Sequence, residues 1–413
     1  MDGMSPVEAP TTTPSTGVAT AVEPSSGRAP SVEPSSGAAP TPSVEPSSGA
    51  APTPSGEASS SAAPTLPPRG AVRLPRPAPR GPISTALLAA LSRSPGAVDL
   101  GPLRAAVAAR LTDPTDWRTD EDVQLALLCL YELHYRGIAG VDDDWEWDPD
   151  LLAVRAALEV PFEAELRRTV PVPECDRRDR TGVAERLFAL TAAADGPSLS
   201  RHVARKTTEP QLRELLVHRS IYQLKEADPH TWAIPRLAGG PKAALVEIQA
   251  DEYGDGDPHR MHAELFALVM RAFGLDDTYG AYVDHVPAAT LASLNAMSLF
   301  GLHRRLRGAI VGHLAAFEMT SSLPNRLYGN GVRRLGHDDV AATWYFDEHV
   351  AADAVHEQIA GRDLAGALAE QEPELVDDIL FGAACCLALD GAAAARMMQA
   401  WDADGTSLLR PLP

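Results

Sequence analysis

Apolar residues recur at helical spacing along most of the chain after residue 82. Runs with apolar positions three or four residues apart lie at 83–91, 123–133, 151–158 and 212–216. This period of about 3.6 residues is typical of amphipathic α-helices. Strict alternation of β-branched residues, which would indicate strands, does not persist beyond a few positions. The pattern predicts an all-α body.

Breaks between these helices are marked by short proline and glycine motifs. Asp-Pro pairs stand at 113–114, 148–149, 228–229 and 257–258, and Gly-Gly-Pro stands at 239–241. Proline cannot donate a backbone hydrogen bond, and glycine weakens a helix interior, so such motifs favour turns between helices. Abundant alanine and leucine between the breaks favour helix intrinsically.

The first 80 residues have a different composition. They hold 17 of the chain's 36 prolines and no aromatic residue, and the first aromatic is Trp117. The sequence SVEPSSGAAP begins at Ser31 and again at Ser43, with a variant at Ala21. Such a segment cannot bury enough apolar area to offset its chain entropy. We predict that 1–80 is a disordered, repeat-containing tail that acts as a spacer, with partner docking as the alternative.

Charge and cysteine usage narrow the class of protein. With 36 basic and 56 acidic residues, the net charge is −20, which disfavours nucleic acid and anionic membranes as partners. The four cysteines form no CxxC pair, so neither a disulfide framework nor a zinc ribbon is expected. We find no apolar run of about 18 residues and no signal peptide, and we expect a cytoplasmic protein with no membrane segment.

The segment 344–356 contains three metal-capable side chains at helical spacing. His349, Asp353 and His356 are separated by four and three residues, so they lie on one stripe of one helix. Imidazole and carboxylate together suit iron, manganese or zinc. The alternative is a solvated polar face on which histidines coincide.

Glu252 and His262 are candidates for further ligands from facing helices. Ten residues separate them, and a Gly-Asp-Gly-Asp-Pro interruption lies between them. We expect this break to turn one side chain toward the other. His259 competes with His262, but His262 directly precedes an apolar run and is therefore expected to enter the core.

Glu318 is a third candidate because it lies in a strongly apolar helix. Burying a carboxylate is costly unless it is paired or bound to a metal. The alternative to metal binding is an ion pair with one of Arg304, Arg305 or Arg307.

Taken together, these residues resemble the ligand pattern of the haem-oxygenase-like di-iron oxidases. The closest resemblance is to the iron-containing redox enzyme family, carried by the stretches 224–236, 317–326 and 347–356. Two N-terminal stretches, 131–137 and 143–149, are also similar to that family. The resemblance covers about residues 83–410 and leaves the tail outside.

The resemblance implies a haem-oxygenase-like bundle of about seven core helices without haem. It divides the body, 81–413, into auxiliary helices at 81–205 and a metal-binding bundle at 206–405. It implies two Fe(II) ions per chain and O2 as co-substrate. The implied ligands are Glu252, His262, Glu318, His349, Asp353 and His356. Glu318 is the implied bridge, and no catalytic residue is expected beyond the ligands.

Some relatives add one more carboxylate ahead of the first glutamate. Glu226, 26 residues before Glu252, is the candidate for that position. An ion pair with Lys225 or Arg236 is the alternative.

The function implied is that of a non-haem di-iron oxidase or oxygenase acting on a small organic substrate in a biosynthetic pathway. Its reaction would be N-oxygenation, desaturation, decarboxylation or carbon–carbon cleavage, with an external electron donor. Two alternatives stay open: a mononuclear zinc or manganese hydrolase, and a metal-free helical binding protein. The sequence leaves open the substrate, the donor, a homodimer and the role of the tail.

Overall fold

The computed structural model describes residues 72–113, 116–192 and 198–412 and shows an α-helical chain. No strand occurs among these residues, and their one isolated β-bridge joins Leu74 to Ile138. The all-α prediction is therefore confirmed. Residues 1–71 of the expected tail lie outside the described residues.

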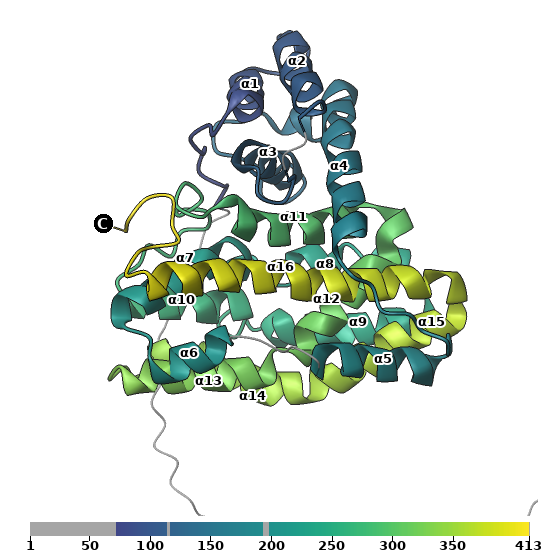
Figure 1. Cartoon of the computed structure of the whole chain (residues 1–413), viewed down its shortest axis with the longest axis vertical. Helices are drawn as coiled ribbons and strands as arrows, with labels where there is room; N and C mark the ends of the chain where they lie inside the picture. The colour runs from purple at the N-terminus through teal and green to yellow at the C-terminus, as the bar shows by residue number, and fades with distance from the viewer. Residues whose placement is uncertain (1–71, 114–115, 193–197, 413) are drawn as a thin grey trace, which may run out of the picture. The chain divides into compact units, whose positions relative to one another are not determined.

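The helices are grouped in chain order into an N-terminal and a C-terminal series, where η marks 3-10 or π-helical segments. The N-terminal series is α1 (Pro82–Leu91), α2 (Gly101–Arg110), α3 (Glu121–Glu132), η1 (Asp143–Trp147), α4 (Pro149–Thr169), α5 (Arg180–Ala192) and α6 (Leu199–Arg205). The C-terminal series is α7 (Glu209–Gln223), α8 (Asp228–Thr231), η2 (Ile234–Arg236), α9 (Gly239–Glu252), η3 (Gly254–Gly256), α10 (His262–Ala272), α11 (Ala288–Leu302), η4 (Arg304–Leu306), α12 (Arg307–Met319), α13 (Ser322–Arg334), α14 (Val340–Gln358), η5 (Ile359–Gly366), α15 (Ala367–Gln371), η6 (Pro373–Leu375) and α16 (Val376–Asp402). The expected boundary at residue 205 is not a structural one, because α5 and α6 pack on η5 and α13 among the bundle helices (Figure 1).

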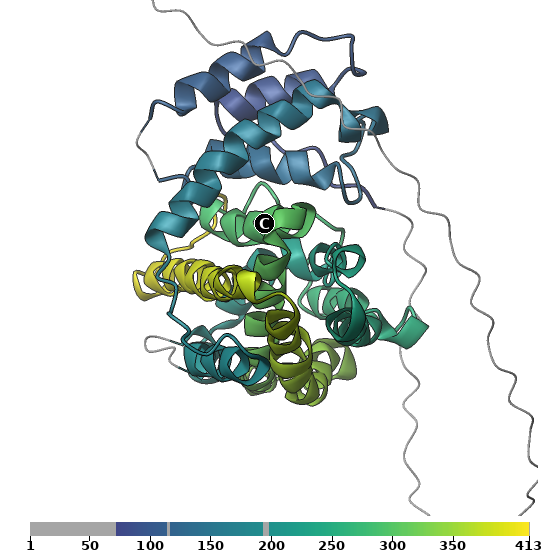
Figure 2. The same cartoon turned by 90° about the vertical axis from the view of Figure 1, so that its right-hand side faces the viewer.

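Helices α1 to α4 form a separate layer that packs on α11 of the bundle (Figures 1 and 2). The contact is made by α3, whose residues 123–132 are all buried. The Asp120 side chain caps the start of α3 by accepting hydrogen bonds from the backbone N–H groups of Asp122 and Val123. Such a cap satisfies donors that have no partner within the helix.

The bundle is held together by a close approach of α12 and α16. A Cβ atom on Gly312 would lie 1.8 Å from the Ile379 carbonyl oxygen, and one on Gly382 would lie 1.9 Å from the Ala309 oxygen. Only glycine permits this backbone-to-backbone distance. The two helices thus form a rigid pair, against which α14 and η5 also pack through α12.

Residues 72–80 differ from the expected tail because they pack against the helical body. Leu74 is fully buried and pairs through its backbone with the chain at Gly137 and Ala139. The Arg80 guanidinium forms an ion pair with Glu121 at 2.6 Å. These contacts, a second ion pair between Arg73 and Asp143 and a few backbone hydrogen bonds fix a short segment whose average composition resembles that of the preceding chain. The ordered body therefore begins before residue 81.

One helical segment, Pro373–Asp402, is long and apolar enough to cross a membrane, which corrects the expectation that no such run exists among the described residues. Its most apolar 18-residue window has a mean hydropathy of 1.6, and half of that window is buried in the protein. The segment contains α16, which packs against α12 and α11. A core helix of a folded domain meets the same criteria.

Candidate metal centre

The interruption between α9 and α10 brings Glu252 and His262 together. Glu252 is the last residue of α9, His262 is the first of α10, and Gly254 and Asp255 turn the chain between them with φ of +68° and +52°. Glu252 Oε2 lies 3.0 Å from His262 Nδ1. His259, the competitor, is exposed in this turn.

Helix α14 contributes His349 and His356, and both side chains are buried. The Nδ1–H of His349 donates to the backbone carbonyl of Tyr345, one turn earlier, at 2.7 Å. This bond fixes the tautomer, so the Nε2 lone pair faces Glu226, whose Oε1 is 3.7 Å away. Asp353 also lies in α14, but its side chain is outside the described part of the structure.

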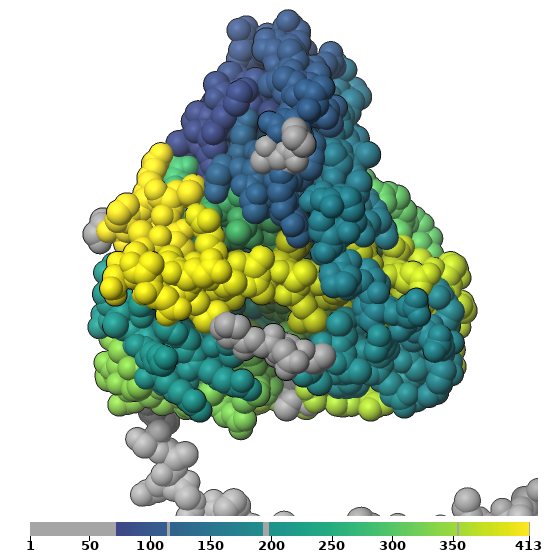
Figure 3. Space-filling model, viewed as in Figure 1, coloured from purple at the N-terminus to yellow at the C-terminus, as the bar shows by residue number. Residues whose placement is uncertain are grey.

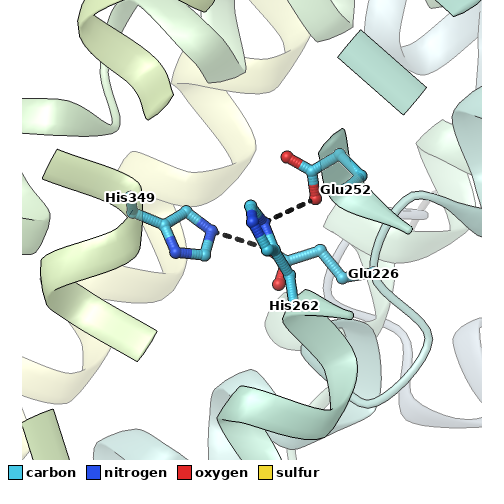
Figure 4. A group of neighbouring side chains, drawn as sticks. All are labelled: Glu226, Glu252, His262 and His349. Atoms are coloured by element: carbon cyan, nitrogen blue, oxygen red, sulfur yellow. Dashed lines mark ion pairs between the residues drawn. The ribbon is translucent and has the colours of Figure 1, made fainter. Parts of the chain in front are cut away.

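A first group of four buried side chains converges from three helices and one turn (Figure 4). Its members are Glu226, Glu252, His262 and His349, and one potential ligand atom from each lies within 4.8 Å of all the others. Glu226 comes from the turn between α7 and α8, and the others come from α9, α10 and α14.

The alternative ion pairs of Glu226 do not form. Lys225 instead contacts Glu132 at 2.9 Å, and the Arg236 guanidinium donates to backbone carbonyls of residues 301 and 302. Both Glu226 oxygens accept from the Tyr345 hydroxyl, at 3.0 and 3.1 Å. A tyrosine, not a cation, therefore orients this carboxylate.

A second group consists of Glu252, Glu318 and His356, again with ligand atoms within 4.8 Å of one another. His356 Nδ1 lies 3.4 Å from Glu318 Oε2. Two of the arginines considered as partners of Glu318 are engaged elsewhere. Arg305 pairs with Glu163, and Arg307 pairs with Glu372.

The two groups share Glu252, which differs from the expected arrangement in two respects. First, Glu252 belongs to both groups, whereas Glu318, the expected bridge, belongs to one. Second, His349 and His356 belong to different groups, so these two histidines of the stripe do not converge on one potential metal position. Seven residues rise about 10.5 Å along a helix, which separates the two imidazoles although they lie on one face.

Asp251 is a neighbour of the centre that the sequence reasoning missed. Its Oδ2 lies 3.1 Å from His356 Nε2, and contact with this imidazole lowers the pKa of the Asp251 carboxyl. The available signal was its position next to Glu252. Consecutive helix residues point about 100° apart. Glu252 can therefore face the ligand groups while Asp251 approaches His356 from another side.

The electrostatics of the centre favour a cation. Burial lowers the pKa of His356, but Asp251 and Glu318 outweigh burial and raise it to about 10. Burial likewise opposes ionisation of Glu252, yet His262 and the neighbouring imidazoles bring its pKa below the usual value. Protonated imidazoles thus balance the buried carboxylates. Divalent metals displace such protons when they bind.

The polar atoms of the first group also fit metal ligands. Glu252 Oε2 and His262 Nδ1 are buried and contact each other at 3.0 Å, but no well-aligned hydrogen bond from a described residue reaches either atom. Buried polar atoms without such a bond are rare because each one costs free energy. A metal ion between a carboxylate oxygen and an imidazole nitrogen would satisfy both.

A helical bundle with carboxylates and imidazoles on facing helices is the architecture of metal-carrying bundle proteins. Residues 213–391 match the family model described as an iron-containing redox enzyme, so this part of the chain is similar to that family. All seven residues expected as ligands lie within the matched segment. The family supports an iron oxidoreductase. No curated protein matches the chain.

Proposed function

We propose that the protein is a non-haem di-iron oxidase or oxygenase that uses O2 to oxidise a small organic substrate. The observation that supports it is the pair of buried ligand groups sharing Glu252. A shared carboxylate is the arrangement that two neighbouring cations require. The family match supports iron as the metal.

In this proposal Glu226, Glu252, His262 and His349 hold one iron, and Glu252, Glu318 and His356 hold the other. Asp353 stays a proposed ligand of the second ion. Two Fe(II) ions supply electrons to O2, and carboxylates and imidazoles suit this metal.

The surrounding residues position the ligands. The Tyr345 carbonyl holds the tautomer of His349, and the Tyr345 hydroxyl holds Glu226. Asp251 orients His356. Such outer hydrogen bonds commonly matter for metal affinity by a factor of about 10 to 100.

A cavity of about 10 Å³, room for a molecule the size of water, lies over the centre. Four candidate ligands line it, Glu226, Glu252, Glu318 and His349, together with Tyr222, His230 and Phe317. His230 Nε2 lies 3.2 Å from His313 Nδ1, and burial lowers the pKa of both imidazoles, that of His313 to about 3. This neutral pair makes the cavity wall polar without adding charge.

Two other functions account for less of the structure. A mononuclear hydrolase would need only one ligand group and would leave Glu318 and His356 unexplained. A metal-free binding protein would compensate three buried carboxylates by protonated imidazoles alone and would give no reason for two groups that share Glu252. We place the enzyme in the cytoplasm, with an external electron donor and no nucleic acid partner.

Anaerobic Fe(II) titration followed by O2 exposure tests the proposal. We expect two irons per chain and an O2-dependent absorbance change in the wild type. Both should be lost or halved in His349→Ala and in His356→Ala. The exposed His259→Ala is the matched control and should behave as wild type. One tightly bound zinc without an O2 response would instead indicate the hydrolase, and no metal would indicate a binding protein.

A further inference from the structure

A second, larger cavity adjoins the candidate metal centre. Its volume is about 340 Å³, and it lies between α6, α7, α11, α12, α13 and α16. Tyr222 and Phe317, whose rings meet edge to face at 5.4 Å, line both this cavity and the small one over the ligands. The surface is hollowed beside α16 (Figure 3). Most of the lining surface is apolar, with contributions from Leu215, Leu294 and Met397, and the size suits a small organic molecule.

Most polar groups that line this cavity are satisfied within the protein. Both ring nitrogens of His218 are hydrogen bonded, one to Thr290 and the other to Ser407. The Thr320 hydroxyl donates to a backbone carbonyl of its own helix. Arg219, Gln223 and Asp390 also line the cavity, and each keeps hydrogen-bonding capacity that its contacts with other described residues leave unused.

Arg219 is a cation with no direct ion pair among the described residues. Burial lowers its pKa, but neighbouring groups that include the carboxylates of Asp390 and Glu226 outweigh burial and raise it. Within the described ranges no residue forms an ion pair or a hydrogen bond with its guanidinium, which lies over the Tyr328 ring at 4.4 Å. The side chain is half-buried and lines the cavity. A guanidinium presents a planar fork of N–H donors that matches a carboxylate.

Asp390 is the complementary anion on the facing helix α16. Its carboxylate accepts a hydrogen bond from Ser293 at 2.5 Å, but it makes no ion pair with Arg219 or with any other described cation. The residue is exposed and lines the cavity. Desolvation by the cavity wall raises the pKa of the Asp390 carboxyl, while the Ser293 hydrogen bond and the charge of Arg219 oppose this rise.

Gln223 connects the cavity to the metal centre. Its side chain is 4% exposed, and its Oε1 has no hydrogen-bond partner among the described residues. Its Nε2 donates to the Tyr345 hydroxyl at 2.7 Å, and that hydroxyl in turn donates to Glu226. The cavity therefore offers one donor fork and two acceptors close to the candidate ligands.

We propose that this cavity binds an amino acid with an apolar side chain, held by its carboxylate on Arg219 and by its ammonium group on Asp390 and Gln223. This assignment rests on the proposed function, because it names the substrate class of the same centre. The apolar lining receives the side chain, next to the Tyr222 and Phe317 wall.

The presence of a cation and an anion in one cavity favours a zwitterion over a ligand with one charge. A simple carboxylic acid would place a second anion near Asp390, and a simple amine would place a second cation near Arg219. A ligand that carries both groups offers each side chain an opposite charge and should bind best.

Calorimetric titration of the full-length protein under anaerobic conditions tests this site without turnover. The probes are L-phenylalanine, 3-phenylpropanoate, which lacks the ammonium group, and 2-phenylethylamine, which lacks the carboxylate. We expect L-phenylalanine to bind about tenfold or more tightly than either analogue. L-Leucine and L-methionine test how broadly the apolar lining accepts side chains.

Two variants assign the charged contacts. Arg219→Gln should weaken L-phenylalanine and 3-phenylpropanoate about tenfold and leave 2-phenylethylamine unchanged. Asp390→Asn should weaken L-phenylalanine and 2-phenylethylamine and spare 3-phenylpropanoate. The matched controls are Arg396→Gln and Asp402→Asn, which change exposed residues of α16. If a variant does not fold, the comparison of the three probes on wild-type protein still decides the assignment.

Other results would overturn the assignment. Absence of binding by all three amino acids would do so, as would equal affinity for L-phenylalanine and one of its analogues. Unchanged L-phenylalanine affinity in folded Arg219→Gln would exclude the carboxylate contact. Iron binding and O2 reactivity without amino acid binding would contradict the amino acid site but not the proposed function. Amino acid binding without iron binding or O2 reactivity would contradict the proposed function but not the amino acid site.

Discussion

At the scale of single residues, Glu252 is the side chain common to both candidate ligand groups. We expect Glu252→Ala to lower the iron content from two per chain to nearly none, because each group loses a ligand. Glu226→Ala should remove mainly one ion, since Glu226 belongs to one group. The measurement is iron per chain after anaerobic loading and desalting. Glu247→Ala, an exposed glutamate of the same helix, is the control, and two irons retained in Glu252→Ala would contradict the shared position.

His218 should contribute a pH dependence to stability. Burial lowers its pKa from 6.5 to about 4, so the folded protein keeps it neutral. Below about pH 6.5 the unfolded chain takes up a proton that the folded state does not bind. The free energy of unfolding should therefore fall by up to about 3 kcal/mol as the pH drops from about 6.5 to 4.

Denaturant unfolding of His218→Gln across this pH range measures the effect. The variant should be less stable than the wild type at pH 7 because its hydrogen bonds change, but its stability should fall less toward pH 4. The exposed His259→Gln should keep the wild-type slope. Equal slopes for His218→Gln and the wild type would exclude this contribution.

The candidate ligand residues could be selected from the sequence because their types and spacing are unusual in apolar helices. Their grouping could not, because it depends on distances between helices. His349 and His356 share a stripe in the sequence, yet the rise of α14 assigns them to different groups. Arg219 and Asp390 were not selected at all, since each is an ordinary charged residue until the facing helix is known.

At the scale of elements, the contact between α12 and α16 depends on two glycines. We expect Gly312→Ala to destabilise the protein by about 1–3 kcal/mol or more, because the added methyl group would overlap the Ile379 carbonyl. Gly391→Ala in α16 meets no atom within 4 Å and should be neutral or stabilising by about 0.5–1 kcal/mol. Thermal and denaturant unfolding measure both. A Gly312→Ala protein as stable as the wild type would show that the helices can move apart freely.

Several element boundaries could be predicted from short motifs. The Asp-Pro pair at 148–149 is the N-cap and first residue of α4, and the pair at 228–229 begins α8. The interruption between Glu252 and His262 also falls where it was expected. The π-helical segment η5, which directly follows α14, has no comparable signal because it continues a helix without a breaker.

At the scale of the whole molecule, the body depends on the short segment before α1. A protein beginning at residue 72 should unfold at the wild-type temperature, whereas one beginning at residue 81 should be less stable by about 2–5 kcal/mol. The deletion would remove Leu74, which is fully buried, and the ion pair between Arg80 and Glu121. Thermal unfolding of both proteins decides the matter, and equal stability would show that the segment is dispensable.

The all-α class and the helical body could be predicted because the apolar period is long and consistent. The packing of 72–80 could not be predicted, since few residues carry it and the surrounding composition is that of a spacer. Helix α16 also could not be interpreted from the sequence alone, because its hydropathy fits both a membrane span and a core helix. Its packing against α11 and α12 accounts for its apolar composition.

The sharing of Glu252 has a consequence for how the two ions would load. Two binding events that use one carboxylate are coupled, and the coupling free energy is the same in both directions. The first ion would fix the carboxylate for the second but would also withdraw negative charge from it. The balance of these two effects sets whether half-loaded protein accumulates. If the first ion favours the second, the fraction of fully loaded protein would rise steeply with iron concentration. If the first ion disfavours the second, the fraction would rise gradually.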